Sequence, residues 1–335
     1  MNNKNNILTD SFGRQHSYLR ISLTELCNLR CTYCMPAEGI QLSPKSHIMN
    51  FDEVYTIAKT FVDHGVTKIR LTGGEPFVRK DVDVILKKLA TLPVELAITS
   101  NAVIIDRFVP LLKECNIKNL NISLDSLIKE KFGQITRRND FDKVLNNIHL
   151  LINEGFNVKI NAVLIKGFND DEIIDFINFT KDLPINMRFI EFMPFDGNKW
   201  NKEKMVSLNE ILNTVNHAFS ESEVIRLKDA PNDTSKNYKI EGYKGSFAII
   251  SSVTNPFCDS CNRLRLTANG RIKNCLFSAS ESDLLTAVRQ GKDIKPIIQK
   301  AVQSKFKIRG GMDTQDKLES PDFHTNNRSM IAIGG

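Results

Sequence analysis

The chain has 335 residues, more than one ordinary domain, so we expect one large domain with an appendage, or two domains. Hydrophobic residues make up 41% and charged residues 25%, with no apolar run near the roughly 18 to 20 residues that cross a bilayer, which favours a soluble globular protein. The net charge of +6 comes from 45 basic and 39 acidic residues without a long basic run, so charge alone indicates neither a nucleic acid nor a membrane partner.

The amino terminus and the cysteine count favour a reducing compartment. The polar segment Met1–Asn6 lacks an apolar secretion signal, so we expect a cytoplasmic protein. Seven cysteines, an odd number, do not describe a disulfide scaffold.

From Tyr18 to about Met193, β-type runs alternate with helical patterns. The expected strands are Tyr18–Leu23, Lys68–Thr72, Glu95–Thr99, Leu120–Leu124, Val158–Ile165 and Met187–Phe192. The expected helices are Asp52–His64, Asp81–Ala90, Asp106–Glu114, Phe141–Asn153 and Asp170–Thr180, several with an Asp placed to cap the amino terminus. This alternation predicts parallel βαβ units. Their ligands gather at the carboxyl ends of the strands, where Gly73-Gly74-Glu75, Ser100-Asn101 and Asp125 fall.

The rhythm breaks after Pro194, so we expect a domain boundary near 195 to 205. The later expected elements are a helix at Leu208–Phe219, a loop at Ala230–Asn237, and strands at Phe247–Ser251, Leu264–Thr267 and Arg271–Lys273. Asn269-Gly270 predicts a hairpin between the last two strands. The mixed-charge stretch Arg309–Lys317 is expected to be solvated.

Three cysteines follow the first expected strand closely. Cys27, Cys31 and Cys34 form the pattern C-x3-C-x2-C on a polar loop. Three thiolates can hold a four-iron cluster and leave one iron open. A zinc site is the alternative, but it would need a fourth His or Cys, and the nearest downstream His, His47, has no suitable spacing.

A second group consists of Cys258, Cys261 and Cys275, with the spacing C-x2-C-x13-C. The expected hairpin would return Cys275 to within roughly 10 Å of Cys261. We expect a second three-cysteine cluster with an open iron, with a zinc ribbon as the alternative. Cys115 has no ligand partner in its neighbourhood and is expected to be a small core residue.

The first cysteine group, with Tyr33 just before its last cysteine, resembles the signature of the radical S-adenosylmethionine superfamily. The segment Leu71–Pro76, with the sequence Leu-Thr-Gly-Gly-Glu-Pro, lies one βα unit later and corroborates the resemblance. The resemblance implies that the open iron binds S-adenosylmethionine and that reduction yields a 5′-deoxyadenosyl radical. The S-adenosylmethionine contacts that it implies are Tyr33, Gly74, Ser123 and Met193.

The second group, continued as Cys261-x-Arg263-x-Arg265, resembles the molybdenum cofactor biosynthesis protein A family, together with the terminal Gly334-Gly335. The resemblance covers nearly the full length and includes the segments 121–125 and 189–193. Members of this family are GTP 3′,8-cyclases, which convert GTP to (8S)-3′,8-cyclo-7,8-dihydroguanosine 5′-triphosphate in the first step of molybdenum cofactor biosynthesis. The resemblance implies an α/β fold with an incomplete (β/α)6 barrel at 1–200. It also implies a carboxyl-terminal α+β element at 201–335 that carries the second cluster and binds substrate.

A triphosphate held in a barrel requires cations. Arg263 and Arg265, two apart on an expected strand, would project to one face and pair with phosphate oxygens. The resemblance implies that guanine binds the open iron of the second cluster, and that the GTP contacts are Arg20, Lys68, Arg70, Thr99, Lys159, Arg188, Arg263 and Arg265. No catalytic side chain is expected beyond the S-adenosylmethionine bound to the first cluster.

The resemblance also implies partners. These are a reducing electron donor and the downstream cyclic pyranopterin monophosphate synthase, with neither nucleic acid nor membrane involved. The sequence leaves the oligomeric state open, with a homodimer among the alternatives. The terminal glycines are expected to enter the barrel.

Two positions depart from the family pattern. Ala102 stands where the family usually has Gly, which argues against a positive-φ turn there, and Ser329 stands where it usually has Pro. Two other functions stay open. A radical peptide-modifying maturase would usually carry more carboxyl-terminal cysteines. A zinc-dependent nucleic-acid module would need a basic aromatic surface, which a single Trp, five Tyr and the mild charge disfavour.

Overall fold

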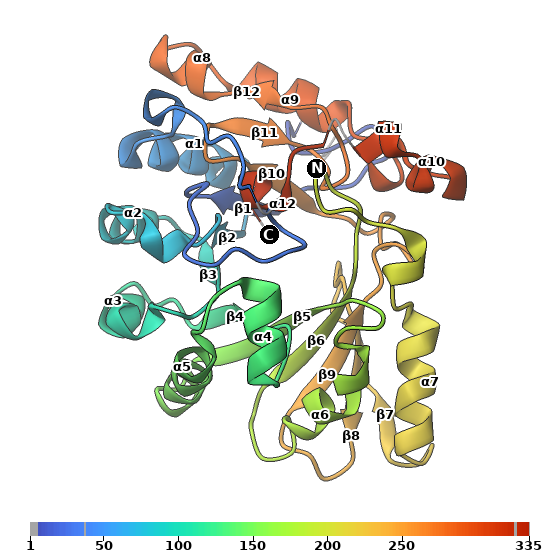
Figure 1. The fold of residues 1–335 in the computed structure, drawn as a ribbon. Helices are drawn as coiled ribbons and strands as arrows, with labels where there is room; N and C mark the ends of the chain where they lie inside the picture. Colours follow the sequence, from blue (N-terminus) through green and yellow to red (C-terminus); the bar gives the residue numbers. More distant parts are fainter. Residues whose placement is uncertain (1–5, 37, 325–326, 335) are drawn as a thin grey trace.

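The strands form one mixed sheet in the computed structural model, which describes residues 6–36, 38–324 and 327–334 (Figure 1). The order across the sheet is β12-β11-β10-β1-β2-β3-β4-β5-β6-β9-β8-β7. The strands are β1 (Tyr18–Ser22), β2 (Lys68–Thr72), β3 (Glu95–Ser100), β4 (Asn119–Ser123), β5 (Asn157–Leu164), β6 (Asn186–Glu191), β7 (Val224–Arg226), β8 (Lys236–Ile240), β9 (Ser246–Ile250), β10 (Arg263–Leu266), β11 (Arg271–Lys273) and β12 (Ser282–Asp283).

Helices connect and cover these strands, with α1, α2, α3 and α5 in succession along one side of β1 to β5 (Figure 1). The helices are α1 (Phe51–Asp63), α2 (Val82–Leu89), α3 (Val109–Glu114), α4 (Lys129–Thr136), α5 (Phe141–Asn153), α6 (Ile173–Asn178), α7 (Leu208–Ala218), α8 (Leu285–Arg289), α9 (Lys295–Gln303), α10 (Gln315–Glu319), α11 (Pro321–His324) and α12 (Met330–Ile333). Short 3₁₀ turns are η2 (Lys45–His47), η3 (Pro76–Val78), η4 (Ile105–Phe108), η5 (Asp170–Glu172), η6 (Lys202–Lys204) and η7 (Arg309–Gly311).

Strands β1 to β6 are parallel and neighbour one another in chain order, as the alternating pattern predicted. All six lie within one residue of their predicted starts and ends. The sequence did not predict α4, which is short and has three buried residues. The predicted helices at 106–114 and 170–180 each begin as a 3₁₀ turn.

The prediction that Asp residues cap the helices was wrong. Helix α1 is capped by Asn50, whose side chain accepts from Glu53 N (2.9 Å) while the Glu53 carboxylate accepts from Asn50 N (2.8 Å). Asp81 precedes α2 but makes no side-chain cap, because its carboxylate pairs with Arg79 (2.7 Å).

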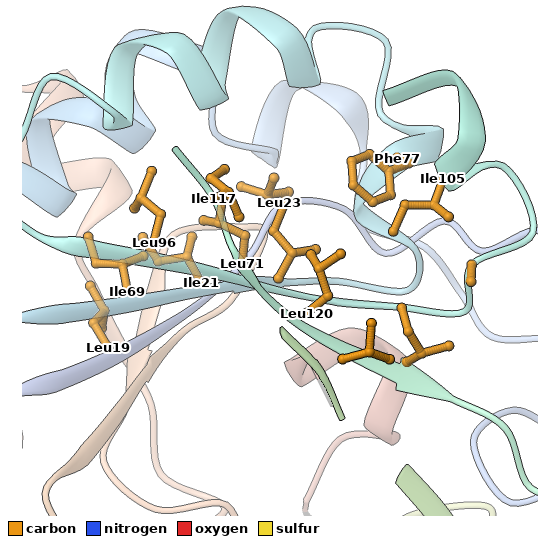
Figure 2. Close-up of a cluster of buried hydrophobic side chains, with 14 of the residues drawn as sticks. Leu19, Ile21, Leu23, Ile69, Leu71, Phe77, Leu96, Ile105, Ile117 and Leu120 are labelled. Atoms are coloured by element: carbon orange, nitrogen blue, oxygen red, sulfur yellow. The ribbon is translucent and has the colours of Figure 1, made fainter. Parts of the chain in front are cut away.

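The apolar core lies between the sheet and the helices. Leu19 and Ile21 of β1 and Ile69 and Leu71 of β2 are fully buried there, and Figure 2 shows them together with Leu96 on one side of the strands. Because side chains alternate along a strand, the residues between them point to the opposite face. That face is where the charged residues of β1 and β2 lie.

Residues beyond 200 extend the sheet at both ends. Strand β9 pairs in parallel with β6, and β10 pairs in parallel with β1. Strands β10 and β11 form the predicted antiparallel hairpin, closed where Thr267 N donates to Arg271 O (2.9 Å). Cys115 lies in the core with 6% of its surface exposed, which confirms its predicted place.

Among the helices of the described residues, none has the length and apolar character needed to span a membrane.

The hairpin turn gives a test of the fold. Gly270 has φ of 68°, and a Cβ there would lie 2.5 Å from Leu285 Cβ, whereas Gly291 has φ of 65° with nothing within 4 Å of such a Cβ. Both Gly→Ala variants carry the left-handed penalty of roughly 1 to 2 kcal/mol, but Gly270→Ala should lose a further amount of about 1 to 3 kcal/mol from overpacking. Urea unfolding under anaerobic conditions measures the difference, and equal losses would contradict this packing of the hairpin.

Candidate active site

The first cysteine group lies on the loop after β1, and the end of β2 packs directly against it. Gly74 N donates to Thr24 O and Glu75 N to Leu26 O, both at 2.8 Å. A Cβ at Gly74 would lie 2.3 Å from Leu26 O and 3.0 Å from Cys27 Cβ. Only glycine therefore allows this approach to the cysteine loop, a reason for Gly74 that sequence reasoning had not found.

Glu75 connects the carboxyl ends of β2 and β3 to this loop. Its buried carboxylate accepts from Ser100 Oγ (2.9 Å) and Asn101 N (2.7 Å). The Asn101 side chain in turn donates to Asn28 Oδ1 (2.7 Å) and approaches Cys27 Sγ (3.7 Å). The predicted strand-end residues therefore come together behind the first cysteine.

Tyr33 and Asp125 join the cysteine loop to β4. The Tyr33 hydroxyl donates to Asp125 Oδ2 (2.8 Å), and Asp125 Oδ1 accepts from Val163 N (2.8 Å). Burial raises the pKa of Asp125 to about 6. Tyr33 also lines a hollow of about 520 Å³, together with Thr32 and Phe192, which we call the Tyr33 hollow.

The three thiols of the first group are close enough to influence one another. Burial raises the pKa of Cys31 and of Cys34, and each is raised further by Cys27. A buried thiolate needs a cation nearby, so these thiols suit iron ligation, in which the metal replaces the proton. Among the described residues, no group of three or more His, Cys, Asp or Glu side chains is arranged to hold a single metal ion.

The second cysteine group lies where the amino-terminal segment, β10 and the 305–309 segment meet. Cys258, Cys261 and Cys275 all line one hollow of about 170 Å³, which we call the inner hollow. Cys258 Sγ accepts from Arg309 N (3.4 Å), and Cys258 O accepts from Arg14 Nη1 (2.8 Å).

The sheet register places cations side by side on the face opposite the core. One cross-strand row contains Arg265 of β10, Arg20 of β1 and Arg70 of β2. The next row contains Arg263, Tyr18 and Lys68. Like charges directly opposite one another destabilise a sheet, so this arrangement calls for an anion.

Two arginines on this face have side-chain nitrogen atoms without a hydrogen-bond partner in the described structure. Arg20 Nε and Arg263 Nε and Nη1 are buried without a hydrogen-bond partner in the described structure. Both residues line the inner hollow and also a neighbouring one of about 470 Å³, the outer hollow. An unsatisfied buried donor costs roughly 1 to 3 kcal/mol, which a bound anion would recover.

The pKa values of two cations on this face reflect the same crowding of positive charge. Burial and the neighbouring charge of Arg20 together lower the pKa of Arg265 to about 9. Burial and Arg188 lower the pKa of Lys159 to about 8. A polyanion between these groups would favour their charged forms.

All eight predicted GTP contacts line one or both of these hollows. Thr99 and Arg265 line the inner hollow, and Lys68, Arg70 and Lys159 line the outer one. The residues shared by both are Arg20, Arg188 and Arg263.

The four predicted S-adenosylmethionine contacts are more dispersed. Tyr33 lines the hollow named after it, Gly74 packs behind Cys27, and Met193 lines the inner hollow. Ser123 is the last residue of β4. The structure does not gather these four around one hollow.

Sequence reasoning missed one residue of the site, Lys305, and misplaced another, Arg309. Arg309, predicted to be solvated, is only 9% exposed, and its Nη1 donates to Val253 O (2.9 Å). Lys305 is buried and donates to Arg263 O (3.1 Å). Neither could have been found from spacing, because both are brought to the second cysteine group only by tertiary packing.

Ala102 and Ser329, the two departures from the family pattern, adopt the backbone conformations that Gly and Pro would favour at these positions. Ala102 adopts φ of 60°, so the inference against a positive-φ turn was wrong; Ala102 N donates to Ser100 Oγ (3.0 Å), and its carbonyl accepts from Asn147 (2.7 Å). Ser329 has φ of −57°, within the range that proline fixes.

The carboxyl-terminal segment reaches the site through α12. Arg265 Nη1 donates to Gly334 O, and a Cβ at Gly334 would lie 2.3 Å from Thr72 Oγ1 at the end of β2. The backbone N–H of Ile331 also donates a hydrogen bond to the Cys34 sulfur, which opposes the effect of burial on the pKa of that thiol. Gly335, the other terminal glycine, lies outside the described residues.

Comparison with known families matches two parts of the chain. Residues 21–180 match the Radical SAM superfamily, and residues 185–309 match Molybdenum Cofactor Synthesis C.

Relatives match nearly the whole chain. It is 48% identical to the mitochondrial GTP 3′,8-cyclase of Arabidopsis thaliana over 98% of this chain and 84% of the relative. It is 43% identical to the GTP 3′,8-cyclase of Listeria monocytogenes over 98% of this chain and 99% of the relative. Molybdenum cofactor biosynthesis protein 1 of Homo sapiens is 46% identical over 97% of this chain, which spans 51% of that protein.

Among solved structures, Streptococcus suis SuiB bound to S-adenosylmethionine has the same fold, with a TM-score of 0.59 at 19% identity over 84% of this chain and 65% of that one.

The family match and the relatives show that the chain is a radical S-adenosylmethionine enzyme, a class that uses an iron–sulfur cluster and S-adenosylmethionine. Within that class it belongs to the family of GTP 3′,8-cyclases and molybdenum cofactor biosynthesis proteins.

Glu75 gives a pH-dependent test of the site. Burial raises its pKa from 4.5 to about 7, so its contribution to stability is complete below pH 4.5 and is lost as the pH rises toward 7. Relative to Glu75→Gln, which cannot ionise, the wild type should lose about 3 kcal/mol of unfolding free energy across that window. Urea unfolding at a series of pH values measures this, and a pH-independent difference between the two proteins would contradict it.

Proposed function

We propose that this protein is a GTP 3′,8-cyclase that forms (8S)-3′,8-cyclo-7,8-dihydroguanosine 5′-triphosphate in molybdenum cofactor biosynthesis. The observation that carries the proposal is the pair of cation-lined hollows beside the second cysteine group. Relatives of that name, 43% and 48% identical over 98% of this chain, support the same reaction.

The first cofactor site is assigned to Cys27, Cys31 and Cys34, which would hold a 4Fe–4S cluster with S-adenosylmethionine on its open iron. This group supplies a 5′-deoxyadenosyl radical when it is bound and reduced. The residues proposed to hold S-adenosylmethionine are Tyr33, Gly74, Ser123 and Met193. The chain itself positions the loop, through Glu75 and Asn101, and covers it with apolar side chains.

The second cofactor site is assigned to Cys258, Cys261 and Cys275, which would hold a second 4Fe–4S cluster in the carboxyl-terminal element. The donor set fits, because three thiols share one hollow with cations and Lys305 and Arg263 help to lower the pKa of Cys261 in spite of its burial. In this proposal the sheet is an incomplete (β/α)6 barrel at 1–200, and residues 201–335 close it.

GTP is proposed to lie across the inner and outer hollows, with guanine at the second cluster and the triphosphate on the cationic rows. The proposed contacts are Arg20, Lys68, Arg70, Thr99, Lys159, Arg188, Arg263 and Arg265. Arg20 and Arg263 have unpaired donors there, which supports phosphate binding.

The partners proposed are a reducing electron donor, the downstream cyclic pyranopterin monophosphate synthase, and a second copy of the chain. The cytoplasmic location stays a prediction. The alternative of a peptide-modifying maturase has less support, since SuiB bound to precursor peptide SuiA is similar to this chain in fold at only 18% identity.

The test of the reaction is anaerobic incubation with dithionite, S-adenosylmethionine and each nucleoside triphosphate in turn. Deoxyadenosine should form with GTP and not with ATP, CTP or UTP, together with the cyclised nucleotide. Equal yields with all four, or with none, would overturn the proposal.

The first cluster can be tested separately. Replacing Cys27, Cys31 or Cys34 by Ala should abolish reductive cleavage of S-adenosylmethionine, because two thiolates cannot present the open iron correctly. Cys115→Ser is the matched control, since Cys115 lies in the core, and it should keep about eight irons. Cleavage at the wild-type rate in any of the three Ala variants would contradict the assignment.

The phosphate contacts can be tested at Arg263. Arg263→Ala should weaken GTP binding about thirtyfold or more, because it removes one partner of a desolvated charge pair. The affinity of Arg263→Lys should lie between those of the wild type and Arg263→Ala, because lysine keeps the charge but loses the planar fork. Arg271→Ala on the same hairpin is the control, because that side chain is exposed. Titration of GTP against iron-loaded proteins measures this, and wild-type affinity in Arg263→Ala would remove the triphosphate from this position.

A further inference from the structure

Tyr18 opens β1 in the middle of the cationic face. It lines the outer hollow, and its hydroxyl oxygen accepts from Arg70 Nε at 2.6 Å. Arg70 Nη1 donates to Ile98 O (2.9 Å), so the guanidinium is held from both sides. Among the hydrogen bonds of the described residues, the Tyr18 hydroxyl takes part only as the acceptor of this one.

The ring of Tyr18 is surrounded by three more cations. Arg20 Cζ and Arg263 Cζ each lie 5.7 Å from the ring centroid, and Lys68 Nζ lies 5.9 Å from it. These are cation–π distances, each worth roughly 0.5 to 1 kcal/mol or more when desolvated. One side chain therefore contacts cations from β1, β2 and β10.

The acidic groups facing Tyr18 are too few to balance these cations. Glu95 of β3 pairs with Lys68 (2.7 Å), and Asp233 lines the outer hollow near Lys159 and Arg188. The charged groups around Tyr18 from all neighbouring elements are Arg20, Lys68, Arg70, Glu95, Lys159, Arg188, Asp233, Arg263 and Arg265. Seven of these nine carry positive charge.

We propose that Tyr18 is a positioning residue of the nucleotide site: its hydroxyl oxygen stands in for the triphosphate while the site is empty, and it takes up a proton and donates to a phosphate oxygen when GTP binds. This inference rests on the proposed function. The proton comes from solvent, and no bond other than this O–H is formed or broken.

The titration of Tyr18 supports the geometry. Burial would raise the pKa of its hydroxyl, but Arg70, Arg20 and Lys68 outweigh burial and lower the pKa to about 7. In the empty site the oxygen is therefore largely ionised above pH 7. A bound triphosphate brings its own negative charge to the same cations, which returns the pKa upward and draws a proton onto the oxygen.

The consequence is a defined pH dependence of GTP binding. Because the complex holds one proton more than the empty site, the dissociation constant should rise by up to tenfold per pH unit above about pH 7. Lys159, with a pKa lowered to about 8 by burial, and the γ-phosphate also titrate, but they do so in every variant that keeps them. The difference between the wild type and Tyr18→Phe isolates Tyr18, since the variant keeps the ring and loses only the hydroxyl.

The experiment is calorimetric titration of GTP into anaerobic, iron-loaded wild type and Tyr18→Phe from about pH 6 to about pH 9, without S-adenosylmethionine or reductant. At about pH 8, two buffers of different ionisation enthalpy give the number of protons taken up. We expect the wild type to take up nearly one proton more than Tyr18→Phe. We also expect the ratio of its dissociation constant to that of the variant to rise by about tenfold or more between about pH 7 and about pH 8.5. Unchanged iron content and unchanged binding of S-adenosylmethionine in the absence of GTP would show that the variant is folded.

Two outcomes would overturn the inference while leaving the proposed function intact. One is equal proton uptake in the two proteins, and the other is a loss of affinity in Tyr18→Phe that is the same at every pH, which is what a purely structural role would give. Absence of GTP binding by the wild type at any pH would overturn the proposed function, and this inference with it.

Discussion

The site depends on one electrostatic constraint, the crowding of like charges on the face of β10, β1 and β2 opposite the core. Parallel pairing in register places Arg265 beside Arg20 and Arg20 beside Arg70, so the Cα atoms of these three cations are held on neighbouring strands by the ladder. The apolar face of the same strands, formed by Leu19, Ile21 and their neighbours, supplies the burial that keeps these cations together. In the proposed function, a bound triphosphate would offset this locally unfavourable charge distribution.

The cysteine loop illustrates a different kind of support. It contains little regular structure of its own, and its position is set by backbone contacts with the end of β2 and by the Glu75 carboxylate, which accepts from both Ser100 and Asn101. A loop held by a rigid scaffold can present three thiols in a fixed arrangement. The close approach at Gly74 shows how little space remains between loop and sheet.

Much of this arrangement was predictable because it is local. Strand alternation and the Asn269-Gly270 hairpin are short-range patterns, and each placed its residues correctly in the fold. Arg309 and Lys305 were not predictable, because their burial arises from packing against Cys258 and β10, far away in the sequence. Ala102 shows a further limit: its left-handed backbone is imposed by hydrogen bonds to Ser100 and Asn147 against the preference of the residue.

The pairing of β1 with β10 also affects how the chain folds as it is made. Strand β1 cannot pair at its outer edge until Arg263 of β10 has been synthesised, and β6 cannot do so until Ser246 of β9 has been synthesised. Until then we expect the nascent β1–β6 sheet to have two unpaired edge strands, and such edges favour association between nascent chains. Long-range parallel pairing is slow, so this interval is extended. Chaperone capture during synthesis would therefore matter most for the first two hundred residues or so, before the strands that protect them have emerged.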